Sequence, residues 1–445
     1  MLGALRSAFA TPDLRRKILF TIGILVVYRL GASTPSPGVS YGNIQQCLEQ
    51  AQGGDNQNIY SLVNLFSGGA LLQLSVFALG IMPYITASII TQLLTVVIPR
   101  YEQLKKEGQS GQAKLTQYTR YLTIALAVLQ ATGIVALAIR GQLFPDCPPQ
   151  FPPIPDDSVF NLVVVVVVMT AGTAVVMWLG EMITERGIGN GMSLLIFASI
   201  AARIPTEGKN ILDQNTPLVF AVVCVFVLAI VASVVFVELG QRRIPVQYAK
   251  RMVGRRMYGG TSTYLPLKVN QAGVIPVIFG SSLLYLPQLL AQLTGASEAS
   301  DPSWWQDLIN RHLVDQSSFV FIALYFLLIV FFTYFYVSIT FNPEDRAEEM
   351  KKFGGFIPGI RPGRPTAEYL SFVLSRITLP GSLYLATVAV LPNFFLDLTG
   401  GQEQGAAQNF PFGGTAVLIL VGVGLNTIQQ IEAQLTQRNY EGFLR

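Results

Sequence analysis

The residue types that perform catalysis or hold metals are scarce in this sequence and do not cluster. His312 is the only histidine, and no cluster of His, Cys and carboxylate residues indicates a metal site or a Ser-His-Asp set for hydrolysis. No G-x-x-x-x-G-K-[ST] motif occurs, and the glycine-rich stretch at 187–191 lacks the spacing of a dinucleotide fingerprint. We therefore expect no enzymatic activity, no catalytic residue, no metal and no cofactor, and a driving force that a partner supplies.

The three cysteines leave one question open. Cys47 and Cys147 fall in segments expected on the outer face of a membrane, where a disulfide and two unpaired thiols are equally compatible with the sequence. Cys224 lies within an apolar segment, where we expect its side chain to pack against neighbouring residues.

The composition places the chain in a membrane. Of its 445 residues, 51% are hydrophobic and 13% are charged, whereas soluble domains carry about 25% charged residues. Crossing the hydrocarbon core takes about 20 mostly apolar residues. Eight blocks without a charged residue, with weaker first and fifth candidates, predict an all-α protein with ten spans: 18–33, 56–99, 121–139, 158–180, 187–202, 214–237, 269–297, 316–343, 377–396 and 404–431.

Lysine and arginine placement predicts the orientation. If ten spans start from an inside N-terminus, 25 of the 30 basic residues fall on one face and four on the other, with Arg29 inside the first span. Loops rich in Lys and Arg face the cytoplasm. We expect a multi-pass protein of the cytoplasmic membrane with both termini on the cytoplasmic side.

Two short patterns recur five spans apart. Residues 80–85 and 273–278 both read Gly-apolar-apolar-Pro-x-Ile, and residues 189–196 share a glycine-led apolar pattern with 413–419. The patterns predict two inverted five-helix halves, 1–205 and 206–445, with a pathway between them near the midplane. Chance is the alternative, because glycine and proline are common in membrane helices. Pro83 and Pro276 would kink their helices at equivalent places.

The predicted pathway lacks charged groups. Aspartate and glutamate occur only at span ends and in loops, which disfavours a proton-coupled carrier. Branched aliphatic side chains can close a pore by excluding water, although core packing is the favoured interpretation of each residue taken alone. The candidate lining consists of Ile81, Ile85, Met192, Ile196, Ile278 and Ile419.

Two loops carry more basic residues than the orientation of the protein in the membrane requires. The loop 238–268 carries seven basic residues and no acid between 239 and 268, and its apolar residues alternate as in short strands. The loop 342–369 opens as a charged helix at 344–352 and continues into Pro-Gly turns around Arg361 and Arg364. Such loops suit docking of RNA or an acidic protein; contact with anionic lipids is the alternative.

Five stretches, in order along nearly the whole chain, resemble the signature segments of the SecY family, the channel subunits of the bacterial Sec protein translocase. They read "NLFSGGALLQLSVFALGIMPYITASII", "WLGEMITERGIGNGMSLLIFA", "GQRRIPVQYAKR", "LPLKVNQAGVIPVIF" and "FIPGIRPGRPT". A protein-conducting channel is the favoured function; a small-solute transporter with inverted repeats and a membrane-embedded enzyme are the alternatives.

The resemblance implies roles for particular residues. A plug half-helix at about 59–69 would seal the resting pore, and residues 59–66 are too short to span a bilayer at about 1.5 Å per residue. Ile275 would join the aliphatic ring, in which Met192 replaces the usual isoleucine. The plug positions are Ile59, Leu62, Val63 and Phe66, with a hinge at Ser67, Gly68 and Gly69.

The resemblance also implies exits and partners. A lateral gate between the second and third spans and the seventh and eighth would include Pro83, Thr86, Asn270 and Pro276. The expected partners are SecE- and SecG-like small membrane subunits, the SecA motor, the ribosome through its RNA, secretory preproteins with their signal sequences, and anionic lipids. The expected docking residues are Arg242, Arg243, Lys250, Arg251, Arg255, Arg256, Arg361 and Arg364.

Overall fold

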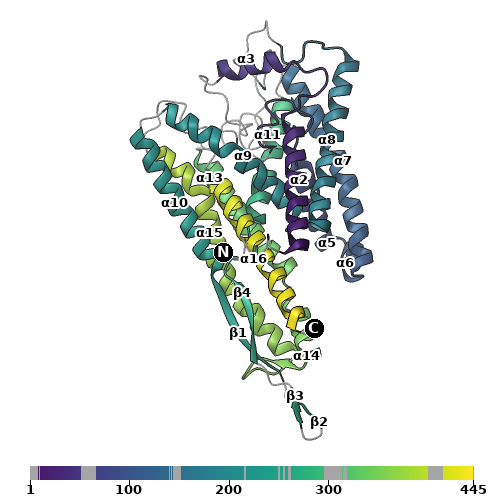
Figure 1. Ribbon diagram of the computed structural model, residues 1–445, viewed down its shortest axis with the longest axis vertical. Helices are drawn as coiled ribbons and strands as arrows, with labels where there is room; N and C mark the ends of the chain where they lie inside the picture. The colour runs from purple at the N-terminus through teal and green to yellow at the C-terminus, as the bar shows by residue number, and fades with distance from the viewer. Residues whose placement is uncertain are drawn as a thin grey trace.

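The protein is a bundle of long helices with a small β-structure at one end (Figure 1), as seen in a computed structural model. The structure describes residues 9, 11–51, 67–139, 141, 143, 152–214, 217–248, 251–253, 256–258, 262–294, 313, 318–398 and 414–443. Within these residues one helix occupies each predicted span, which confirms the all-α, ten-helix prediction. They are α2 (Pro12–Ser33), α5 (Met82–Val97), α7 (Gln109–Ile139), α8 (Val159–Arg186), α9 (Gly191–Gln214), α10 (Pro217–Leu239), α11 (Ile275–Thr294), α13 (Phe319–Thr340), α15 (Arg364–Leu398) and α16 (Gly414–Phe443).

The lengths of these helices differ. Among the described residues, six helices are individually long and apolar enough to cross a membrane, and α5 with α6 (Pro99–Lys106) forms a seventh candidate bent by 99°. The apolar parts of α9 and α11 are shorter, at Gly191–Thr206 and Ile275–Leu284. Helices α7 and α15 begin well before the charge-free blocks that predicted them, because the backbone hydrogen bonds of a helix continue into water beyond its apolar part.

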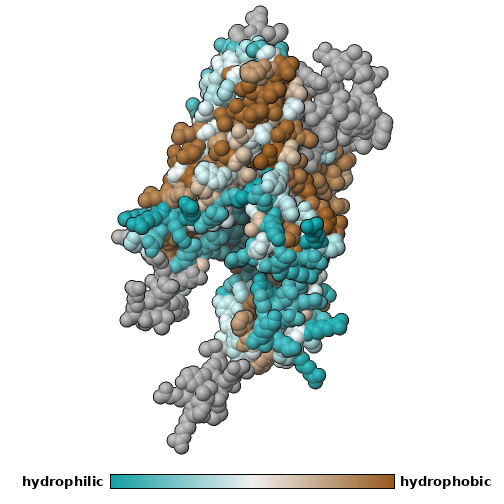
Figure 2. All heavy atoms as spheres, turned by 90° about the vertical axis from the view of Figure 1, so that its right-hand side faces the viewer, coloured by the Kyte–Doolittle hydropathy of each residue, from teal (hydrophilic) through white to brown (hydrophobic). Residues whose placement is uncertain are grey.

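The basic loops form the end of the molecule opposite α3 (Tyr41–Ala51) (Figure 1). Strand β1 (Gln241–Tyr248) pairs antiparallel with β4 (Ser262–Lys268) and with β5 (Gly355–Phe356), in the order β4-β1-β5. A second hairpin joins β2 (Arg251–Val253) to β3 (Arg256–Tyr258). The predicted alternation is confirmed, and so is the charged helix, which is α14 (Pro343–Lys352). Hydrophilic residues gather around this end, below a hydrophobic band (Figure 2).

The hairpin is fixed to the helices through its apolar face. Ile244 of β1 and Leu267 of β4 are buried with Leu370 and Val373 of α15. In a strand, alternate side chains point to opposite faces, so Arg243 remains on the exposed face.

The second span differs from its prediction. The charge-free block 56–99 predicted a helix of full membrane length, but in its described part the chain runs through mostly buried turns from Gly68 to Ile81, and α5 begins only at Met82. Leu74 has a left-handed backbone with φ of +43°, and the N–H of Val76 donates to the Thr34 carbonyl at 2.9 Å. Irregular backbone is tolerated at membrane depth where protein covers it and satisfies its polar groups.

The two motif prolines begin helices instead of kinking them. Pro83 is the second residue of α5 and Pro276 is the second residue of α11. Each follows a glycine in the left-handed region, Gly80 with φ of +53° and Gly273 with φ of +62°. The first turn of a helix has no use for the N–H that proline lacks. The expectation of mid-helix kinks is therefore wrong.

Candidate functional site

The predicted ring residues belong to one apolar cluster, to which four helices contribute them. These residues lie at or within the first turns of α5, α9, α11 and α16. Five of the side chains are buried, and Met192 and Ile275 are half-buried and packed against the same cluster. The buried members are Ile81, Ile85, Ile196, Ile278 and Ile419.

Glycines allow two of these helix starts to approach their neighbours. A Cβ on Gly191, the first residue of α9, would collide with the Gly180 carbonyl oxygen of α8. A Cβ on Gly414, the first residue of α16, would collide with the Val388 carbonyl oxygen of α15. The second recurring pattern of the sequence thus marks two helix starts, each pressed against the preceding span.

The predicted hinge has the backbone that glycine permits. Gly68 and Gly69 have φ of +68° and +92°, where other residues are strained. The Arg29 guanidinium donates to the Gly68 carbonyl at 2.8 Å, and the Leu71 N–H donates to the hydroxyl of Ser67 at 3.2 Å. Sequence reasoning treated Arg29 only as an interruption of the first span; an arginine inside an apolar helix was the available signal. The plug positions Ile59, Leu62, Val63 and Phe66 lie outside the described residues.

The residues predicted for a lateral gate separate into two places. Pro83 and Thr86 lie on α5, and α5 and α7 both contact α11, which also packs on α13. Pro276 is the second residue of α11, the helix that makes these contacts. Asn270 instead donates from its Nδ2 to Glu238 Oε1 of α10 at 2.6 Å and to the Gly273 carbonyl at 3.2 Å.

Glu238 was not singled out from the sequence, because a glutamate at a span end ordinarily remains in water. Here its side chain is only 6% exposed, and Asn270 is only 3% exposed. Lys268, nearby, donates to Gln429 of α16 at 3.0 Å. This polar group links α10, α16 and the entry to α11.

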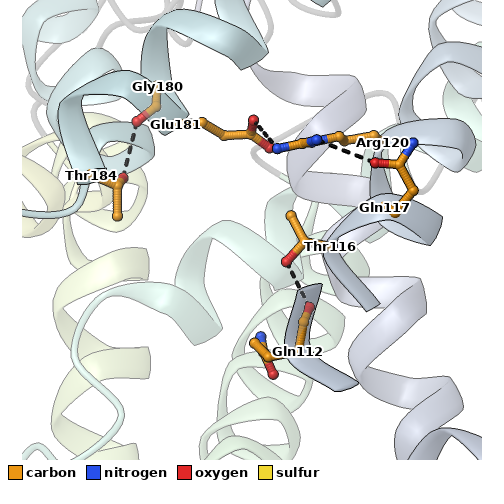
Figure 3. Close-up of polar contacts among 7 residues, drawn as sticks. All are labelled: Gln112, Thr116, Gln117, Arg120, Gly180, Glu181 and Thr184. Atoms are coloured by element: carbon orange, nitrogen blue, oxygen red, sulfur yellow. Dashed lines mark hydrogen bonds and ion pairs between the residues drawn. The ribbon is translucent and has the colours of Figure 1, made fainter. Parts of the chain in front are cut away.

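A further ion pair joins two neighbouring spans (Figure 3). Arg120 of α7 donates from Nε and Nη2 to the two carboxylate oxygens of Glu181 of α8, at 2.9 and 2.7 Å. Arg120 Nη1 also donates to Gln117 at 3.2 Å. A bidentate pair of this kind sets both distance and orientation between its helices. Opposite charges 61 residues apart gave no local pattern from which it could be predicted.

The basic loops present some of their predicted docking residues to solvent. Arg242 and Arg243 are exposed on β1, and the Arg243 guanidinium lies 4.8 Å from the centre of the Tyr264 ring. Arg361 and Arg364 are exposed beside Gly359 and Gly363. The structure describes the backbone alone for two further members, Arg251 and Arg256, while Lys250 and Arg255 lie outside the described residues.

The cysteines and the possible metal ligands complete the survey. Cys47 is buried and disulfide-bonded, and Cys224 is free and exposed. Cys147 and His312 lie outside the described residues. Across the part of the chain that the structure describes, no group of three His, Cys, Asp or Glu residues could hold a metal ion.

Comparison with known proteins decides the family. The family model of SecY matches residues 75–428. The chain is 67% identical to the protein translocase subunit SecY of Mycobacterium bovis over 446 residues, and 68% identical to that of Mycobacterium leprae, covering 100% of both chains in each case. The chain belongs to the SecY family. A Streptomyces scabiei protein translocase subunit SecY is 62% identical over 449 residues, again with 100% of both chains covered.

Solved structures share the SecY-family fold. One titled "The structure of a protein conducting channel" aligns with a TM-score of 0.62, covering 94% of this chain and 91% of that chain at 19% identity. "Sec61 in the Canine ribosome-channel complex from the endoplasmic reticulum" aligns with a TM-score of 0.60 at 18% identity, with the same coverage. At these identities the likeness shows the fold alone.

Membership in the SecY family confirms several predictions from the sequence. SecY proteins are membrane-embedded translocation channel subunits and are not enzymes, so the chain is a channel subunit of that kind. The enzyme alternative is thereby excluded. The roles of the ring, the plug, the gate and the docking residues remain predictions.

Proposed function

We propose that this chain forms the pore through which secretory polypeptides cross the cytoplasmic membrane and from which membrane segments leave sideways into lipid. One observation carries the proposal: aliphatic side chains from the first turns of four helices belong to one apolar cluster. A constriction of such side chains excludes water and ions when idle. Its aliphatic side chains form no hydrogen bonds that would select particular residues of the translocating chain, so extended polypeptides of any sequence can pass.

The two halves, 1–205 and 206–445, are proposed to be inverted repeats with the pore between them. Two matched pairs of local structures support this. Gly80 and Gly273 are both left-handed and both lie three residues before a proline in a first helical turn. Gly191 and Gly414 both begin a helix against a carbonyl of the preceding span.

The segment 59–66 is proposed to plug the pore from the outer side. The left-handed Gly68 and Gly69 give the chain a turn that can reorient, and the bond from Arg29 to the Gly68 carbonyl holds it in its resting position. A translocating chain would displace the plug about this turn.

The lateral exit is proposed to run between α5 with α7 and α11 with α13, where these helices contact one another. Ile89 of α5 and Phe279 of α11 belong to one buried apolar cluster, which supports an apolar contact between the two pairs of helices. A hydrophobic signal segment can replace such contacts at little cost in free energy, whereas a polar segment cannot. Asn270 would not line the exit. It would instead hold the segment before α11 in place through its hydrogen bond to Glu238 of α10.

The basic end is proposed to face the cytoplasm and to dock the SecA motor and the ribosome. Leu14 in the first turn of α2 packs with Ile431 in the C-terminal half of α16 and with Ile188 between α8 and α9, which supports the proposal that both termini face the same side. Arg242, Arg361 and Arg364 are exposed at that end. Anionic lipids and SecE- and SecG-like subunits would contact the apolar flanks.

The ring can be tested in reconstituted vesicles. Ile85→Ser and Ile278→Ser should each raise the resting ion conductance and allow precursors with defective signal sequences to pass, because serine is smaller and admits water. Val163→Ser, at an exposed position of α8, is the matched control and should behave as wild type. If both ring variants seal like wild type, the constriction lies elsewhere.

A further inference from the structure

Helix α6 is a side arm of the N-terminal half. It leaves α5 at an angle of 99° and packs back on α7. The Tyr101 ring lies 5.7 Å from the Tyr118 ring of α7, and Leu104 is buried. A Cβ on Gly111 of α7 would collide with the Leu104 carbonyl oxygen, so the two helices are in close backbone contact. Helix α6 must therefore move together with α7.

Lys105, one turn of α6 after Tyr101, reaches the C-terminal half. Lys105 Nζ donates to the Ile339 carbonyl oxygen at 3.2 Å. Ile339 is the second-last residue of α13, where the carbonyl groups lack helical partners and the helix dipole is negative. A lysine is therefore well suited to this position.

A second pair of opposite charges lies beside this bond, with Lys106 on α6 and Asp345 on α14. The pKa of Lys106 is raised, first by its hydrogen bond to Glu102 on its own helix and further by the negative charge of Asp345 on α14. Asp345 lies in the first turn of α14, directly after α13, together with Glu344. Positive charge on α6 thus faces negative charge at the α13–α14 junction.

We infer that Lys105 fastens the basic end of the lateral exit and sets how hydrophobic a segment must be to open it. This rests on the proposed exit between α5 with α7 and α11 with α13. When that exit opens, α6 leaves with α7 and the bond from Lys105 to Ile339 breaks. An exposed charged contact of this kind shifts an equilibrium by about two- to fivefold, enough to bias the exit towards its closed state without locking it.

The experiment compares four variants in vesicles that contain the purified channel and its motor. The measured quantity is the initial translocation rate of a precursor with a weakened, less hydrophobic signal sequence, divided by the rate of the intact precursor. Lys105→Ala should raise this ratio about two- to fivefold, and Lys105→Glu should raise it more, because a carboxylate is repelled by the end of α13. Lys105→Arg keeps a donor and should match wild type. Lys352→Ala is the matched control, because Lys352 is exposed and pairs only with Glu348 of its own helix in the described contacts.

Salt supplies a second readout. At about 1 M salt the screening length falls to about 3 Å, so the difference between Lys105→Ala and the Lys352→Ala control should shrink. A purely steric role of Lys105 would leave that difference unchanged and would overturn the inference.

Ile278→Ser serves as the positive control for signal stringency. If Ile278→Ser raises the ratio while Lys105→Ala and Lys105→Glu match Lys352→Ala, the inference fails and the proposed channel function stands. If the wild-type channel translocates neither precursor, the proposed function fails, and the inference fails with it.

Discussion

The bond between Asn270 and Glu238 allows a quantitative test of how the entry to α11 is held. The 2.6 Å contact joins two side chains that are only 3% and 6% exposed. A hydrogen bond to a charged group contributes about 1.5–3 kcal/mol to stability. We expect Glu238→Ala to lower the free energy of unfolding by about 2 kcal/mol, since Asn270 keeps only its weaker 3.2 Å bond to the Gly273 carbonyl.

The partner variants separate the bond from general packing effects. Asn270→Ala leaves the Glu238 carboxylate buried without its donor and should also cost about 2 kcal/mol. Removing both partners leaves neither the Glu238 carboxylate nor the Asn270 amide without the other, so the double variant should cost less than the sum of the two singles by at least about 1 kcal/mol. Glu238→Gln keeps an acceptor without the charge and should cost about half as much as Glu238→Ala.

The measurement is reversible unfolding of the purified chain in mixed detergent micelles. Wild type, Glu238→Ala, Asn270→Ala and the double variant form a double-mutant cycle, and Glu238→Gln is measured beside it. Asn43→Ala is the control, because the amide of Asn43 also donates one hydrogen bond, to the Pro152 carbonyl at 2.9 Å, but in an exposed setting. Its effect should stay within about 0.5 kcal/mol. Additive costs for Glu238→Ala and Asn270→Ala would refute the reasoning, because they would show that the two side chains do not stabilise one another.

Two further predictions concern helix contacts. Gly191→Ala should destabilise the protein by about 1–3 kcal/mol in the same unfolding assay, because the new methyl collides with a backbone oxygen of α8, whereas Gly23→Ala, with open space around it in α2, should be neutral or stabilising; equal effects would contradict the close approach. Arg120→Ala should cost about 1–2 kcal/mol, an intermediate value for a pair whose side chains are 39% and 15% exposed. Arg120→Lys should recover only part of it, since lysine cannot bond both oxygens of Glu181; full recovery would contradict the bidentate geometry.

Local patterns in the sequence were enough to predict the helices, the basic end and the strands. The ten spans follow from the apolar length that a bilayer requires, a property of each segment alone. The strands of the hairpin follow from the alternation of Ile244 and Val246 with polar residues, because side chains alternate between faces along a strand. The turn at 68–69 could likewise be predicted from its two glycines, because their positive φ values are adopted easily only by glycine. The candidate ring was also found in the sequence, since its residues recur at matched positions of two repeated patterns.

Other features depended on the tertiary structure. The sequence around Pro83 is compatible with a position in the middle of a helix and with one at its start. The structure decides between them, because the chain forms buried turns before Met82 and the helix begins there. Glu238 was not singled out from the sequence because a span end ordinarily lies in water, but the folded chain buries this side chain, and Asn270 donates a hydrogen bond to it. Lys105 bonds a carbonyl 234 residues further along the chain. Partners so distant in sequence are set by how helices pack, and packing depends on the shapes of whole surfaces, which no short stretch of residues specifies.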